Sequence, residues 1–118
     1  MYKVARKLNF VLIAVCIFFS QNVLAGYYQG FVERVFSVDH AGGRVYVVLE
    51  NGNGGDSTCT SSAAYWIDPS TDIGKTFIST ALTAKTSGKL VWVSGDNSCH
   101  TGWPVDGAQK MTAIDLKG

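Results

Sequence analysis

The alternation of apolar and polar residues predicts a mainly β structure for most of the chain. Residues 31–38 place apolar side chains on both faces, as in a strand that is partly covered on both sides. Residues 44–50 carry valine and leucine at alternate positions, and the short glycine-bearing connection before them predicts a β-hairpin. Three further strands are expected at 63–67, 89–94 and 111–116.

One segment has helical rather than β periodicity. Apolar residues recur at intervals of three and four from Ile73 to Ala84, and residues 70–72 all have side chains suited to an N-cap. Gly88 is a natural stop, so the sequence predicts one helix within residues 71–87. A single helix between the third and fourth of five strands indicates a small, mainly β, OB-like barrel.

The first 25 residues have the pattern of an export leader. Basic residues near the start are followed by an apolar run over residues 10–19 and by small residues before position 26. The run is too short for the roughly 20 residues of a spanning helix, so an uncleaved anchor is the less favoured alternative. We therefore expect a signal peptide at 1–25, a single domain at 26–118, a periplasmic or secreted protein, and no membrane association after cleavage.

The charge of the expected domain argues against two classes of partner. Three of the ten Lys and Arg residues lie in the leader, which leaves seven against nine Asp and Glu, a net charge of about −2. No basic cluster remains, so neither nucleic acid nor an anionic membrane surface is an expected partner.

Two cysteines are expected to remain after export. Cys59 follows a polar, glycine-rich stretch at 51–58 that we expect to be a loop, and Cys99 follows the fourth strand, whereas Cys16 lies in the leader. An oxidising compartment and a single possible pairing predict a Cys59–Cys99 disulfide, worth about 4 kcal/mol by chain entropy. A metal pair is a poor alternative, because two such distant cysteines without a second C-x-x-C rarely bind zinc.

Catalytic chemistry has little support in the sequence. Only two histidines exist, and His100 with Ser98 and either Asp96 or Asp106 is the one arrangement that could serve hydrolysis. Close neighbours in a loop rarely reach the geometry of a triad, and no metal or cofactor motif is present. We therefore expect a protein that is not an enzyme and needs no cofactor.

The aromatic residues suggest a binding surface instead. Trp92 lies within an apolar strand and is expected in the core, while Trp66 is expected to pack near the disulfide. Trp103 lies in a long polar loop, where it either stacks on a ligand or folds back to cap the barrel. The candidate surface combines loop aromatics and acidic residues: Trp103, Tyr65, Trp66, Asp56, Asp96 and Asp106, with Tyr27, Tyr28 and Tyr46 as its extension.

The order of these features resembles a known group of exported proteins. A cysteine after strand two, Trp66, a helix that ends in Ala81-Leu82, Ala84 and Ser87-Gly88-Lys89, and a second cysteine are similar to small bacterial proteins related to the B subunits of subtilase-cytotoxin-like and pertussis-like toxins. The resemblance implies an OB barrel, a homo-oligomer and binding of a sialylated glycan.

Two functions follow as hypotheses. The first is a non-catalytic binding module, similar to a toxin B subunit, that recognises a glycan or a protein partner. The alternative is a periplasmic immunity protein that inhibits a cell-wall-degrading effector by inserting an acidic loop, with Asp56 or with Asp96 and Asp106, into its active site.

Overall fold

The computed structural model describes residues 26–55, 59 and 63–117 of the 118-residue chain. The expected signal peptide at 1–25 and the candidate residue Asp56 lie outside the described residues.

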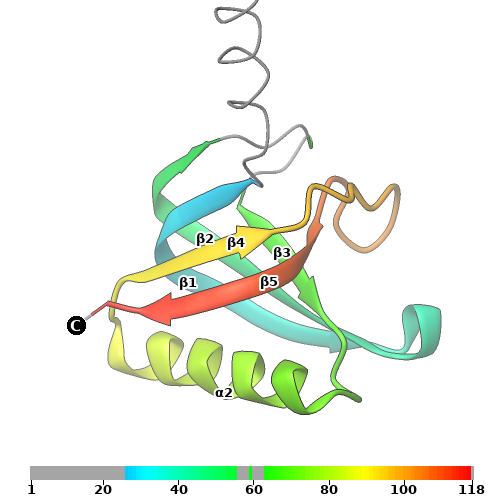
Figure 1. Ribbon diagram of the computed structural model, residues 1–118, viewed down its shortest axis with the longest axis horizontal. Helices are drawn as coiled ribbons and strands as arrows, with labels where there is room; N and C mark the ends of the chain where they lie inside the picture. The colour runs from blue at the N-terminus through cyan, green and yellow to red at the C-terminus, as the bar shows by residue number, and fades with distance from the viewer. Residues whose placement is uncertain (1–25, 56–58, 60–62, 118) are drawn as a thin grey trace, which may run out of the picture.

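Five strands and one α-helix form a closed, OB-like barrel, as the sequence predicts (Figure 1). The strands pair in the order β1-β2-β3-β5-β4, and β4 pairs back with β1 to close the barrel. All these pairs are antiparallel except β3 with β5, which is parallel. The elements are β1 (Tyr27–Val38), the short 3-10 helix η1 (His40–Gly42), β2 (Arg44–Gly55), β3 (Ala64–Ile67), α2 (Asp72–Ser87), β4 (Val91–Gly95) and β5 (Gln109–Leu116).

Strand β2 runs further than the sequence indicates. The predicted loop at 51–58 is wrong in its first half, because Asn53 to Gly55 continue the strand and pair with the start of β1. The pairing jumps from Phe31 opposite Glu50 to Gln29 opposite Asn53, so two residues of β2 bulge opposite a single residue of β1. Polar and glycine-rich composition therefore marks an irregular strand here rather than its end.

Apolar side chains pack on both faces of the β1–β2–β3 part of the sheet. The barrel interior is filled by side chains of β2, β3 and β4, including Val47, Tyr65, Val91 and Val93, none of which is exposed to solvent. The outer face carries a second cluster built on Tyr46, Ala64 and Ala108, with Phe36, Val38, Val48, Trp66 and Val105 packed against it. A register shift near Glu33 lets β1 contribute apolar side chains to both clusters, which explains why both of its faces are apolar.

Helix α2 covers one side of the barrel, along the bottom of Figure 1. The Thr71 hydroxyl accepts a hydrogen bond from the N–H of Gly74, and Gly88 ends the helix in the left-handed conformation, as expected. Ala81 and Ala84 are buried against the barrel interior. Within the described ranges, no helix is long and apolar enough to cross a membrane.

Candidate binding site

The loop between β4 and β5, residues 96–108, folds over the outer face of β2 and β3. Ala108 and Val105 from this loop pack in the second apolar cluster against Tyr46 and Ala64. In OB barrels the outer face of strands 2 and 3 and the flanking β1–β2 and β4–β5 loops are the usual ligand surface. In this protein the β4–β5 loop itself covers part of that face, and the loop becomes the new outer surface.

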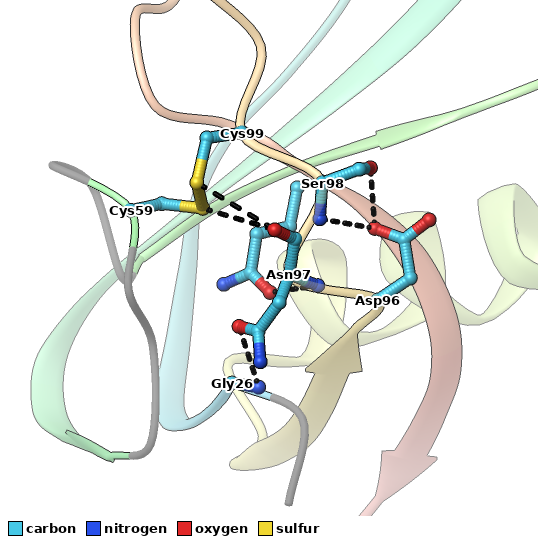
Figure 2. Close-up of a disulfide and its surroundings, with 7 residues drawn as sticks. Gly26, Cys59, Asp96, Asn97, Ser98 and Cys99 are labelled. Carbon is cyan, nitrogen blue, oxygen red and sulfur yellow. Dashed lines mark hydrogen bonds between the residues drawn. A yellow bond between two sulfur atoms is a disulfide. The ribbon is translucent and has the colours of Figure 1, made fainter.

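A disulfide and a hydrogen-bonded turn hold the start of the β4–β5 loop (Figure 2). Cys59 and Cys99 are bonded, with Cα atoms 5.3 Å apart, which confirms the predicted pairing. Asp96 accepts hydrogen bonds from the N–H and the hydroxyl of Ser98, at 2.9 and 2.5 Å. The N–H of Asn97 donates to the buried Gln109 side chain at 2.9 Å. This end of the loop is thus tied to β5 and to the chain before β3.

Backbone hydrogen bonds brace the rest of the loop. The N–H of His100 donates to the carbonyl of Ala108 at 2.9 Å, and the N–H of Gly107 donates to the carbonyl of His100 at 2.7 Å. Nearer the tip, the N–H of Gly102 donates to the Asp106 carboxylate at 2.9 Å. The loop therefore has a defined shape up to Trp103, whose side chain is 65% exposed.

His100 connects the loop to strand β2. Its Nδ1 lies 3.4 Å from a guanidinium nitrogen of Arg44, and its Nε2 lies 2.9 Å from the carbonyl oxygen of Trp103. A guanidinium only donates, so Nδ1 accepts, and Nε2 carries the proton that is donated to the carbonyl. Both ring nitrogens are thus engaged, and the Ser98 hydroxyl bonds Asp96 rather than the imidazole.

An aromatic cluster joins this loop to the turn between β1 and β2. The His40 ring meets the rings of His100 and Trp103 edge-on, with centroids 5.7 and 5.8 Å apart. The buried Tyr46 ring lies beneath, 6.5 Å from His100, and its hydroxyl is buried without a hydrogen-bond partner among the described residues. The β1–β2 turn and the β4–β5 loop, whose counterparts bind ligands in OB barrels, are therefore in contact through these aromatic rings.

A small hollow opens beside Trp66. The guanidinium carbon of Arg44 lies 3.7 Å from the centre of the Trp66 ring, and the Lys110 ammonium lies 5.4 Å from it. The hollow has a volume of about 150 Å³ and is lined by Arg44, Trp66, Ser98, Cys99 and His100. We call it the Trp66 hollow. It is cationic and aromatic on its walls and has the disulfide at its edge.

One carboxylate lies close to these cations. Asp68 follows β3 and accepts hydrogen bonds from the hydroxyl and the N–H of Ser70, at 2.7 and 2.9 Å. These bonds hold the pKa of Asp68 below its ordinary value, and the charges of Lys110 and Arg44 lower it further. Asp68 is thus ionised at neutral pH, and its hydrogen bonds direct it toward the start of α2.

The structure divides the candidate residues of the sequence. Trp103 is exposed at the loop tip and Trp66 is half-buried on the outer face. Asp96 and Asp106 lie in the same loop, where both carboxylates accept N–H groups of that loop. Tyr65 is different, because it is fully buried inside the barrel and is not part of the surface.

Other aromatic positions also depart from expectation. Tyr46 is buried under the β4–β5 loop and does not extend the surface. Trp92 is half-buried rather than in the core, and its ring stacks on Tyr27 outside the barrel at 6.4 Å. The reason is the alternation of β4, in which Val91 and Val93 point inward and the residue between them points outward.

Sequence reasoning missed Arg44 and Lys110. The alternation of side chains along β2 does contain a signal for Arg44. Because Val45 and Val47 point inward, Arg44 must share the outer face with Tyr46. Lys110 is opposite Trp66 in the parallel pairing of β3 and β5, which the sequence alone does not reveal.

No protein-family model, no curated protein and no solved structure matches the chain. The relationship to toxin B subunits therefore stays a prediction, and the function has to be inferred from the loops and strands themselves.

Proposed function

We propose that this protein is an exported, non-catalytic binding module that recognises a glycan or a protein partner through its β4–β5 loop. The observation that carries the proposal is Trp103, which is 65% exposed at the tip of a loop braced by a disulfide and by backbone hydrogen bonds. An exposed aromatic ring on a braced loop is placed to stack on a sugar face or to anchor a protein interface.

The position of Trp103 supports this proposal. Its ring contacts His40 of the β1–β2 turn, so both loops that bind ligands in OB barrels contribute to one surface. A pre-formed loop loses little conformational entropy when a ligand binds, which favours affinity. Aromatic rings stack on the apolar faces of sugars and also anchor protein interfaces, so both partner classes fit.

The engagement of His100 supports a role without catalysis. A general base needs a free ring nitrogen within hydrogen-bond reach of its nucleophile. In this protein Arg44 occupies one nitrogen and the Trp103 carbonyl the other, while the hydroxyl of Ser98 is bonded to a carboxylate.

The disulfide supports the proposed compartment. A pair of bonded cysteines is typical of oxidising surroundings, such as the periplasm or the extracellular medium. The resemblance to toxin B subunits adds the proposal that several copies assemble and present their Trp103 loops together.

A comparison of two variants tests the proposed surface. Oxidised residues 26–118, wild-type, Trp103→Ala and Ile73→Ala, are passed over a glycan array and over cell lysate. Ile73 is a matched control, because it is also an exposed apolar residue, at 58%, but lies on α2. We expect Trp103→Ala to lose at least about tenfold in affinity for whatever ligand the wild type selects, and Ile73→Ala to bind normally. Equal binding by all three proteins would remove the proposal.

A second candidate, a periplasmic immunity protein, is favoured by the same braced loop. Loops that enter the cleft of an enzyme are held in shape before binding, as this one is. The inserted group would then be Trp103 rather than Asp96 or Asp106, because those carboxylates already accept hydrogen bonds within the loop. A single cell-wall hydrolase captured in equal amounts and inhibited by the wild type would support this function over glycan recognition.

A further inference from the structure

We propose that the Trp66 hollow is a subsite for a carboxylate group, with Arg44 as its main donor. This inference rests on the proposed function, since it names the chemistry of the ligand at the same end of the barrel. It adds a requirement that Trp103 alone does not impose, namely a negative charge on the ligand beside the aromatic contact.

Arg44 is held in a fixed orientation. Its guanidinium carbon lies 3.7 Å from the centre of the Trp66 ring, and His100 Nδ1 accepts from one of its terminal nitrogens at 3.4 Å. A planar guanidinium that is stacked on a ring loses little freedom when a ligand binds. The side chain is only half-buried, so its remaining edge is accessible.

Most donors of Arg44 are still available. A guanidinium has five N–H groups, and the contact with His100 uses one. Among the residues that the structure describes, Arg44 forms no ion pair, whereas Lys117 pairs with Asp115 at 2.9 Å. A stacked, unpaired guanidinium matches the geometry of a carboxylate, which it binds with two parallel hydrogen bonds.

The walls of the hollow suit one small anionic group. Its volume of about 150 Å³ is below the roughly 300–1,000 Å³ of pockets that hold whole drug-sized ligands, so it accepts a single residue of a larger partner. Trp66 offers an apolar wall, and Lys110 adds a second positive charge near the ring.

Two carboxylates lie near this site, and both have other partners. Asp96 accepts the N–H and hydroxyl of Ser98, and Asp68 accepts those of Ser70. A ligand carboxylate therefore meets Arg44 without displacing an internal ion pair. The group could belong to a sugar acid or to an acidic amino acid, which present the same charge and the same planar oxygens.

NMR titration with small probes tests the subsite directly. Nitrogen-15-labelled residues 26–118 are titrated with glucuronate and with N-acetylaspartate, and with methyl glucoside as the neutral probe. We expect the Arg44 Nε–H and Trp66 indole signals to shift with at least one acid, and the shifts to weaken as salt is raised. Glucuronate alone would identify a sugar acid, and N-acetylaspartate alone an acidic side chain. Equal shifts with the neutral probe would overturn the proposal.

Matched arginine variants separate this subsite from general charge effects. Arg44→Gln should weaken acid binding by at least about tenfold, and Arg44→Lys should bind at an intermediate level, because it keeps the charge but loses the planar fork. Arg34→Gln is the control: Arg34 also stacks on a ring, 4.5 Å from Phe36, but does not line the hollow. Unchanged affinity in Arg44→Gln would overturn the subsite yet leave the role of Trp103 intact, whereas Trp103→Ala tests only the latter.

Discussion

Gly52 decides where strand β2 can bulge against β1. A Cβ at this position would overlap the carbonyl oxygen of Gln29 and lie 2.6 Å from the Cα of Gly30. The Gly52 N–H also donates to the Tyr28 hydroxyl at 3.0 Å, which fixes the bulge at the start of β1. Close backbone approach is thus what requires glycine here.

We therefore expect Gly52→Ala to lower the free energy of unfolding by roughly 2 kcal/mol, because the two strands must separate to admit the methyl group. Urea unfolding followed by circular dichroism measures this loss. Asn53→Ala is the control, since Asn53 is the next residue of the same strand and its side chain is exposed. Similar losses in both variants would show that the bulge tolerates a side chain.

Some residue positions follow from the local sequence pattern and others do not. The alternation of Val45, Val47 and Leu49 predicts a buried face correctly, because period two survives along a regular strand. The same alternation does not show that Tyr65 points inward and its neighbour Trp66 outward. A four-residue strand gives too few positions to tell its two faces apart. The placement of Arg44 on Trp66 depends on pairing across strands, which no local pattern contains.

The β4–β5 loop is the element that the sequence describes least. The sequence predicts a long loop with a bonded cysteine, and the disulfide is confirmed. The sequence does not predict the path of the loop over the outer face of β2 and β3, because Val105 and Ala108 are isolated apolar residues in a polar segment and carry no periodicity. The loop is ordered by contacts with residues that are distant in sequence, such as His40 and Arg44.

Removal of the disulfide should destabilise the whole barrel. The bond spans 40 residues of sequence, so Cys59→Ala/Cys99→Ala should lower the free energy of unfolding by about 4 kcal/mol through the entropy of the unfolded chain. Urea unfolding measures this loss. Amides of β1 and β2 that exchange only through global unfolding should exchange faster by the same free energy, which native-state hydrogen exchange measures. An acceleration confined to residues 96–108 would contradict this prediction and would show that the bond only restrains the loop in the folded protein.

The molecule as a whole is a barrel with the β4–β5 loop on one side and helix α2 on another (Figure 1). Helix α2 completes the inner core through Ala81 and Ala84, whereas Arg44 stacks on Trp66 at the outer cluster and Trp103 lies in the loop above it. Because the two clusters lie on opposite faces of the same strands, changes on the outer surface should leave the inner core folded. This separation is what makes variants of Trp103 and Arg44 interpretable as binding variants.

The ionisation of Tyr65 should lower the stability of the whole barrel at alkaline pH. Its side chain is fully buried in the inner core, and this burial raises its pKa above the ordinary value of 10, with nearby Tyr28 adding to the effect. In the folded barrel Tyr65 therefore stays neutral at a pH where the unfolded chain already ionises. The stabilisation that this neutral tyrosine provides is complete below pH 10 and is lost as the pH rises above it.

Tyr65→Phe should remove this dependence, because phenylalanine does not ionise in either state. We expect the wild type to lose stability between pH 9 and pH 11 with an added slope of at most about 1.4 kcal/mol per pH unit for one proton, and the variant to lose less over the same range. Urea midpoints at pH steps across this interval measure the difference, each protein being compared with its own value at pH 8. Parallel curves would mean that Tyr65 ionises equally easily in both states, and that the inner core is more open to water than its burial indicates.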